Sequence, residues 1–366
     1  MHNVYIKDYE IFSSQGDLQQ SVQKIKTDTT KISKRNGIPF YSFEETIEQD
    51  PNAIYDILKK VVFNIVSKLS NEQKSSTAVM VGTSLIDWHL VNAINASAYE
   101  YKKQPYSSAK TSIDCYAQKL AQEFGLHDFT MTINTACTSS ANALLEASNL
   151  INTGLVDHVI VIGLEIYSPL MSDGFKQMEL ISPTYAKPFD KNRDGLVLGE
   201  AIGTILVTKE KHKWSLLGGF SNCNSATITS VGADGNECVE VMEEALKRVH
   251  LKPTDITAIK AHATGSISND EAELNAISKV FDNSIDFTAM KPYIGHTIGA
   301  SGVVEIALLM GCIDNGFLPK TLFCEESLLK DYTPLNYHKK YQEGTFMCNY
   351  FGFGGNNISL ILEKIL

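Results

Sequence analysis

Short runs of β-branched and aliphatic residues alternate along the chain with longer segments in which apolar residues recur at helical spacing. The short runs are apolar at almost every position, which is typical of strands covered on both faces. They predict strands over residues 77–81, 129–135, 158–164, 202–207, 256–262 and 358–362. The longer segments predict helices over residues 52–69, 140–152, 237–249, 270–281 and 302–312. Because strands and helices alternate, we expect βα units around a parallel sheet.

Two distant segments of the chain resemble each other. GLVLGEAIGTILVTKE begins at Gly195 and YFGFGGNNISLILEKI begins at Tyr350. Both run from glycines into a short apolar strand and then into a pair of Lys and Glu. A repeat of this kind predicts an α/β chain of two similar halves, residues 1–209 and 210–366.

The composition narrows the class of protein. The 366 residues exceed the usual length of one domain, about 100–200 residues, and their 43% hydrophobic content is that of a globular protein. The net charge of −10 disfavours binding to nucleic acid or to anionic lipid. We see no secretory signal and no membrane span, and the seven scattered cysteines form no C-x-x-C pair. We therefore expect a cytoplasmic protein with free thiols and no metal site.

The stretch NTACTSS, residues 134–140, carries the candidate nucleophile. A predicted strand ends here and a helix begins almost at once, so Cys137 lies at the N-terminus of a helix. Unpaired backbone N–H groups and the helix dipole at such a position favour the reactive thiolate. A buried cysteine beside ordinary capping residues explains the stretch equally well, and both interpretations stay open at this point.

Two of the nine histidines lie where such a nucleophile could use them. His262 opens the small-residue loop HATGS, and His296 lies in KPYIGHTIGASG, residues 291–302. A cysteine that accepts an acyl group needs a partner of this type to move protons. The loop FGFGGNN, residues 351–357, can present backbone N–H groups to an oxyanion, or it can be a tight turn.

Together and in this order, these segments resemble the β-ketoacyl-acyl-carrier-protein synthases, the elongating condensing enzymes of the thiolase fold. The resemblance rests on TACTSS at Cys137, HATGS with Asp270 and Glu273, KxxxGHxxGASG from Lys291, the FGFGG loop, and PFDKNRDG at 188–195 with Gly199-Glu200. It spans roughly residue 77 to the C-terminus, and the N-terminal part matches only loosely.

The resemblance implies a thiolase-like five-layer αβαβα fold built from two similar halves. It also implies that Cys137 holds the acyl group while His262 and His296 bind the malonyl thioester and assist loss of carbon dioxide. The other implied roles are an oxyanion site at the backbone N–H groups of Cys137 and Phe353, gating by Phe353, a charge anchor at Lys291 paired with Glu305, and pantetheine contacts at Thr264 and Ser266.

The resemblance further implies partners. The acyl and malonyl groups would arrive on the phosphopantetheine of an acyl-carrier protein, with no resident cofactor and no metal, and the chain would form a homodimer or a heterodimer with a related subunit. The intact Cys-His-His set favours elongation of a fatty-acid, polyketide or polyene chain. The alternatives are a non-catalytic subunit resembling a chain-length factor, and a thiolase acting on coenzyme A esters.

Acyl-carrier proteins are acidic, so an acidic chain can bind one only through a local cationic patch. Lys59, Lys60 and Lys68 on the predicted helix 52–69 are the candidates, although residues 44–50 just before it are acidic. Met131, Ile133 and the segment 99–108 are the candidates for lining an acyl tunnel.

Overall fold

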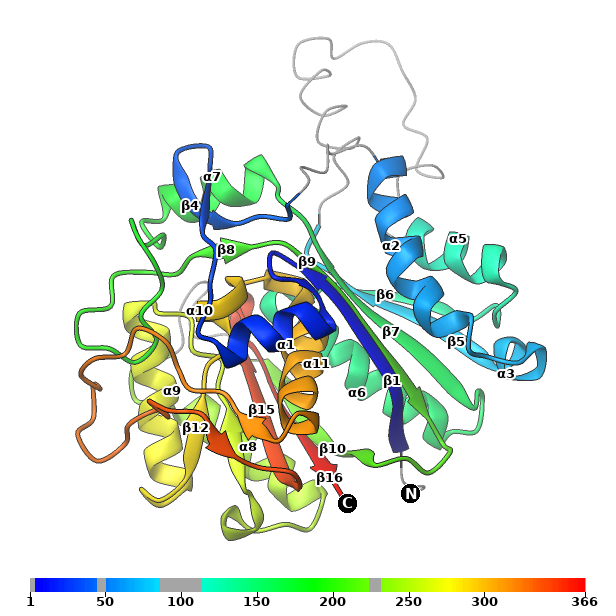
Figure 1. The fold of residues 1–366 in the computed structure, drawn as a ribbon. Coiled ribbons are helices and arrows are strands. Elements are labelled where there is room, and N and C mark those ends of the chain that lie inside the picture. Colours follow the sequence, from blue (N-terminus) through cyan, green and yellow to red (C-terminus); the bar gives the residue numbers. More distant parts are fainter. Residues whose placement is uncertain (1–3, 45–50, 86–113, 224–231, 366) are drawn as a thin grey trace.

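The computed structural model describes residues 4–44, 51–85, 114–223 and 232–365, and a single eleven-stranded sheet organises them (Figure 1). Ten strands form one path, and the two-residue strand β2 (Gly16–Asp17) pairs with β1. The path runs β12 (Asp286–Thr288), β11 (Ala258–Lys260), β15 (Gly344–Phe351), β16 (Asn356–Lys364), β10 (Trp214–Cys223), β1 (Val4–Ser13), β9 (Ala201–Thr208), β7 (His158–Glu165), β5 (Thr77–Gly82), β6 (Thr130–Ile133).

The path is made of two equivalent sets of five strands. If each set is numbered in chain order, both read 3-2-4-5-1 from the outer edge to the middle of the sheet. In both sets the second strand runs parallel to the third and to the fourth. The other neighbouring pairs, fourth with fifth and fifth with first, are antiparallel. The first strands, β1 and β10, pair antiparallel and join the sets. The repeat suspected from the sequence falls on β9 and β16, the fifth strand of each set.

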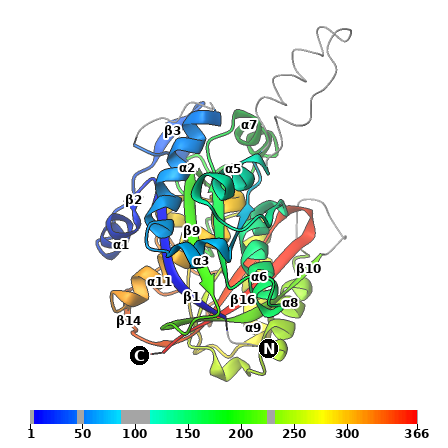
Figure 2. The ribbon, with the colours of Figure 1, turned by 90° about the vertical axis from the view of Figure 1, so that its right-hand side faces the viewer.

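The two strand sets form two of five layers, and helices form the other three, one between the sets and one outside each. Helices α6 (Ser139–Asn152) and α11 (Ser301–Asp314) lie in the middle, where α6 contacts β5, β7 and β9 of one set and β10 and β16 of the other. Helices α2 (Pro51–Val66) and α5 (Cys115–Phe124) cover the first set on its outer face, and α8 (Asn236–Arg248) and α9 (Ile267–Val280) lie beyond the second set (Figures 1 and 2). The architecture is the αβαβα sandwich that the resemblance implied.

Burial along each helix follows from its layer. Helix α11 is buried at nearly every position, as a helix in the middle layer between the two strand sets must be, whereas α8 buries one face only. Close packing in the middle layer depends on glycine: a Cβ built at Gly302 of α11 would lie 2.1 Å from the backbone nitrogen of Ala141 in α6. The two central helices therefore touch backbone to backbone.

The predicted strands and helices are confirmed, with ends that differ by a few residues; residues 256–262, for example, form a strand only at Ala258–Lys260. The expected parallel sheet is wrong in part, because β1, β9, β10 and β16 run antiparallel to their neighbours. Continuous apolar runs report burial on both faces, and they do not report strand direction.

The remaining elements are short and lie around the sheet. They are α1 (Leu18–Lys26), β3 (Ser33–Arg35), β4 (Ile38–Tyr41), α3 (Asn71–Ser75), η2 (Ala136–Thr138), α7 (Pro169–Gln177), β8 (Leu198–Gly199), η3 (Pro253–Asp255), α10 (Lys291–Ile294), η4 (Ile298–Ala300), β13 (Phe317–Leu318), β14 (Lys339–Lys340) and η5 (Phe353–Gly355).

Candidate active site

Cys137 lies in a strained turn between β6 and α6. The residue before it, Ala136, has a φ of 53°, a left-handed conformation that non-glycine residues rarely adopt. Ser139 stabilises the turn, because its hydroxyl donates to the carbonyl of Ala136 (2.6 Å) and accepts from the N–H of Thr135 (3.0 Å). Cys137 is 3% exposed, so the turn directs the thiol into the protein rather than to solvent.

The expected bias of Cys137 toward thiolate is wrong for the resting site. Burial raises the pKa of the Cys137 thiol to about 11, and this outweighs the stabilisation of the anion by the backbone N–H groups of Phe353 and Cys137 and by the charge of Lys291. The same N–H groups are the ones assigned to the oxyanion site, and both lie at the sulfur. A nucleophile at Cys137 would therefore start as a thiol and need a base.

His296 is placed to be that base. Its Nε2 lies 3.1 Å from Sγ of Cys137, and its Nδ1 lies 3.2 Å from the hydroxyl of Ser301. Burial, followed by the charges of Lys291 and Lys260, holds the pKa of His296 well below its ordinary value, so the ring is neutral. A neutral ring can accept the thiol proton at Nε2 while its Nδ1–H donates to Ser301.

The surroundings of His262 place the ring hydrogen on Nε2 rather than on Nδ1. Its backbone N–H and that of Ala263 both donate to the carboxylate of Glu273, at 2.7 Å each. Lys291 donates to the carbonyl of His262, and its Nζ lies 3.4 Å from Nδ1 of the same ring. An ammonium group can only donate, so Nδ1 of His262 accepts and Nε2 carries the hydrogen. His262 therefore presents an N–H donor, whereas His296 presents a base.

The two histidine rings, with centroids 5.4 Å apart, line one cavity together with Cys137. The predicted pantetheine contacts Thr264 and Ser266 line it too, and their hydroxyl oxygens are 2.9 Å apart. Phe353 closes another side, where its ring stacks on Phe175 at a centroid distance of 5.4 Å. The structure thus brings the predicted nucleophile, both histidines, the polar pair and the gate residue to one place.

Lys291 and Glu305 form the predicted ion pair, with 2.8 Å between Nζ and Oε1. The sequence analysis missed Lys260, whose Nζ lies 2.7 Å from the other oxygen of Glu305. Lys260 lies inside the predicted apolar strand 256–262, and a lysine within such a run was the available signal. All three side chains are at most 1% exposed.

Two further signature residues shape the loop after β11. Asp270 accepts hydrogen bonds from the backbone N–H groups of Thr264 and Gly265 and, across the site, from that of Phe189. Burial raises the pKa of Asp270 to about 6 and that of Glu273 to about 7. These carboxylates hold the backbone that carries His262 and do not line the cavity.

The proposed cationic patch is largely neutralised. Lys59 forms an ion pair with Glu123, and Lys68 pairs with Asp8 at 2.6 Å; Lys60 forms no ion pair with any residue that the structure describes. Met131 and Ile133 are half-buried on β6, and the segment 99–108 lies outside the described residues.

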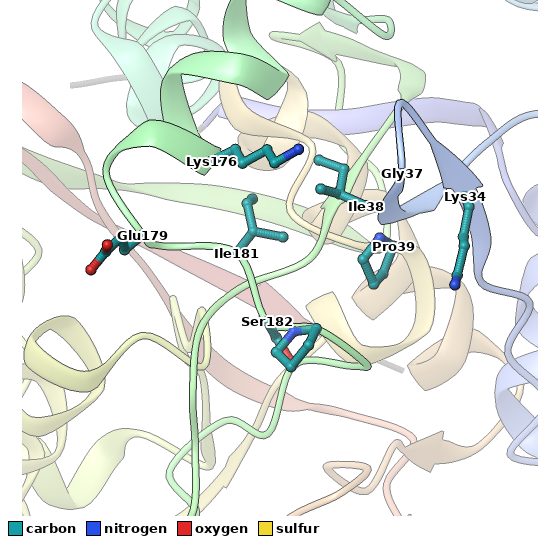
Figure 3. A pocket seen from close by; sticks show the side chains of 9 residues that line it. Lys34, Gly37, Ile38, Pro39, Lys176, Glu179, Ile181 and Ser182 are labelled. Carbon is teal, nitrogen blue, oxygen red and sulfur yellow. The ribbon is translucent and has the colours of Figure 1, made fainter.

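A wider cleft of about 270 Å³ lies between the β3–β4 hairpin and α7 (Figure 3). Lys34 and Lys176 line it together with Ile38, Pro39 and Ile181. Its lining contains no cysteine or histidine. The candidate nucleophile Cys137 and both candidate histidines line the smaller cavity instead.

Over the described ranges, no group of three or more His, Cys, Asp or Glu side chains is arranged to hold a metal ion. Within the same part of the chain, no helix is long and apolar enough to cross a membrane.

Sequence comparisons identify relatives along most of the chain. The β-ketoacyl synthase N-terminal domain matches residues 65–213, and the β-ketoacyl synthase C-terminal domain matches residues 215–325. A chloroplastic 3-oxoacyl-[acyl-carrier-protein] synthase I of Arabidopsis thaliana is 33% identical over 65% of this chain, and this chain spans 54% of its length. A putative mitochondrial 3-oxoacyl-[acyl-carrier-protein] synthase of Schizosaccharomyces pombe is 29% identical over 81% of this chain and 77% of its own length.

Solved structures share the fold over the whole chain. A ketosynthase in complex with its chain length factor from Xenorhabdus doucetiae has a TM-score of 0.86 at 23% identity and covers 100% of this chain and 98% of its own. A β-ketoacyl synthase from Burkholderia phymatum has a TM-score of 0.87 at 19% identity and covers 100% of both chains. Since both domains of one family match in order and the thiolase-like fold extends over the same residues, the chain belongs to the β-ketoacyl synthase family.

Proposed function

We propose that this protein elongates an acyl chain by decarboxylative Claisen condensation with malonyl-acyl-carrier protein. The observation that carries the proposal is the contact of a neutral His296 with the buried thiol of Cys137, 3.1 Å from Nε2 to Sγ, in the cavity that His262 also lines. A thiol with a pKa near 11 gains reactivity only from an adjacent base. The relatives named above are synthases of this type by name.

In the first half-reaction, Cys137 takes the acyl group. The thiol proton passes to Nε2 of His296 as the sulfur attacks the thioester carbonyl of acyl-carrier protein. The backbone N–H groups of Cys137 and Phe353 receive the negative oxygen. Collapse of this intermediate expels the thiol of the carrier, which takes the proton back from His296.

In the second half-reaction, both histidines act as hydrogen-bond donors to the carbonyl oxygen of the malonyl thioester. Breaking the carbon–carbon bond releases carbon dioxide and leaves an enolate, whose carbon attacks the acyl-Cys137 carbonyl. Cys137 leaves as thiolate and takes a proton from the solvent, which supplies the one proton that the condensation consumes. His296 must then carry its hydrogen on Nε2, and the hydroxyl of Ser301 supports either tautomer because it can donate to Nδ1 or accept from it.

We propose that Phe353 gates this cavity. The space at Cys137 is about 20 Å³, enough for about one water molecule and too small for an acyl chain. Turning the Phe353 ring off Phe175 would open it. The phosphopantetheine arm then enters past Thr264 and Ser266, carried by the acyl-carrier protein, and no resident cofactor is required.

We further propose a dimer in a reducing compartment such as the cytoplasm. Among the described residues, strand β6 ends the strand path and has one edge without a partner strand, which could pair with a second subunit, identical or related. All seven cysteines are free, as in a reducing compartment.

The test is acyl transfer from an acyl-carrier protein, followed by mass spectrometry of the intact chain. We expect one acyl adduct on Cys137, its loss in Cys137→Ala, and its retention in Cys238→Ala, which removes a buried thiol of α8 outside the cavity. Addition of malonyl-carrier protein should release carbon dioxide and a ketoacyl product.

Two other outcomes would replace the proposal. The same adduct level in Cys137→Ala, or a wild-type chain without an adduct, would favour the non-catalytic subunit. Condensation of acetyl-coenzyme A without malonyl-carrier protein would indicate a thiolase.

A further inference from the structure

Two buried lysines share one carboxylate behind the histidines. Lys260 at the end of β11 and Lys291 at the start of α10 each contact a different oxygen of Glu305 in α11, at 2.7 and 2.8 Å. Lys291 alone would neutralise Glu305. With Lys260 added, the three side chains carry one net positive charge inside the protein.

The surroundings of Lys260 suit a charged ammonium group. Its Nζ also donates to the carbonyl of Asn349 at 2.9 Å and lies 3.5 Å from the centroid of the Tyr350 ring. A carbonyl oxygen and an aromatic face both attract a cation, and they replace the water that burial removes. Burial lowers the pKa of Lys260, and the charge of Glu305 opposes that shift.

The titratable groups around the cluster cancel this charge only in part. From β15, the Cys348 thiol and the Tyr350 phenol face Lys260, and burial raises the pKa of both, that of Cys348 to about 12. From α9, Glu273 has a pKa raised to about 7 by burial, so at neutral pH it is only partly ionised. The other neighbours are His262 and His296, which are neutral.

The excess charge reaches the reacting groups. Besides burial, Lys291 and Lys260 both lower the pKa values of His262 and His296. An extra cation behind two imidazoles disfavours their protonation and favours negative charge on an oxygen that they bind. The second effect helps the decarboxylation assigned to both histidines. The first keeps the rings neutral between steps and opposes the transient protonation of His296 during acyl loading.

We propose that Lys260 is a positioning residue of the condensation site, which acts through Glu305 and Lys291 to keep His262 and His296 neutral and to stabilise the enolate that they bind. The part of this inference that concerns the enolate rests on the proposed function. The part that concerns the neutral state of His262 and His296 holds whichever thioester reaction the protein catalyses.

The experiment compares Lys260→Met and Lys260→Gln, which remove the charge, with Lys260→Arg, which keeps it. Lys364→Met is the matched control. Lys364 is also largely buried and also shares a carboxylate, Asp314, with a second lysine, Lys213, which remains in the variant. Histidine protonation is followed by NMR of chains labelled with 15N-histidine, and malonyl-carrier decarboxylation is measured against pH. Acyl loading of Cys137 is measured separately.

Loss of the charge should raise the pH at which His262 and His296 protonate, move the acidic limb of the decarboxylation profile to higher pH, and slow decarboxylation about tenfold at neutral pH. Lys260→Arg and Lys364→Met should match the wild type. Unmoved histidine titrations in both neutral variants would overturn the proposal, as would neutral variants that stay insoluble while Lys260→Arg folds. A wild-type chain that decarboxylates nothing, with histidines that still shift in the variants, would reject the proposed function and leave the assignment of Lys260.

Discussion

At the scale of residues, the two neutral histidines of the site differ in their hydrogen-bond partners. His296 contacts Cys137 and can rely on Ser301, whose hydroxyl donates or accepts. His262 is held by Lys291, which can only donate. One ring can change tautomer between the two proposed half-reactions and the other cannot, so the histidines are not interchangeable although both line the cavity.

This difference predicts a split between half-reactions. His296→Ala removes the base 3.1 Å from the thiol, so acyl loading of Cys137 should fall by about 10²- to 10⁴-fold. His262→Ala removes a donor that does not touch the sulfur, so loading should remain within about threefold while malonyl-carrier decarboxylation is largely lost. Mass spectrometry of the acyl-enzyme and carbon dioxide release measure the two steps. Equal losses of loading in both variants would contradict the assignment of the base.

At the scale of elements, the site depends on the contact of the two central helices. The turn η2 leads Cys137 into α6, and the equivalent turn η4, just after His296, leads into α11. Each turn contains a non-glycine residue with positive φ, Ala136 at 53° and Ile298 at 39°. Gly302 allows α11 to approach α6 closely, and the N–H of Val303 donates to the hydroxyl of Ser140 at 3.1 Å. The spacing of the nucleophile and the base therefore follows from helix packing.

Gly302→Ala should break this contact. Its Cβ would lie 2.1 Å from the backbone nitrogen of Ala141, and backbone atoms on both sides would have to move. We expect the free energy of unfolding to fall by about 3 kcal/mol or more, with loss of acyl loading. Gly174→Ala in α7, where a Cβ meets nothing within 4 Å, should leave stability unchanged or raised by up to about 1 kcal/mol. Chemical denaturation checks both; equal stabilities of the two variants would refute the packing argument.

At the scale of the whole molecule, the repeated halves enclose carboxylates that ordinary proteins keep at the surface. Glu165, at the end of β7, is 1% exposed, and its Oε2 accepts hydrogen bonds from the N–H and hydroxyl of Ser84 and from the N–H of Gly299 in η4. Burial raises its pKa to about 7 from 4.5, and these hydrogen bonds oppose the shift. Glu165 thereby connects the first strand set to the turn that precedes α11.

The raised pKa of Glu165 predicts how stability depends on pH. Between about pH 4.5 and 7 the folded chain holds a proton that the unfolded chain releases, so the free energy of unfolding falls as pH rises through this window and then levels off. Glu165→Gln keeps the acceptor oxygen and removes this titration. The decrease in unfolding free energy from pH 4.5 to pH 8 should therefore be smaller by about 3 kcal/mol in Glu165→Gln than in the wild type.

Glu72→Gln, on the exposed helix α3, is the control and should leave the decrease unchanged. Urea denaturation at several pH values gives the comparison. A decrease that is the same in Glu165→Gln and in the wild type would show that Glu165 is already ionised in the folded chain at low pH.

The sequence by itself predicted the order of elements and the repeat, and through its motifs and the family resemblance it indicated Cys137, His262, His296, Lys291 and Phe353 as candidate site residues. These follow from apolar periodicity, which reports burial, and from short motifs whose residues are neighbours in the chain. Strand direction, the neutral state of Cys137, the fixed tautomer of His262 beside the exchangeable one of His296, and the second lysine on Glu305 were decided only by the tertiary structure. Each of these depends on contacts between residues far apart in the chain, such as Lys260 with Glu305, and on the loss of water around them, which no local pattern encodes.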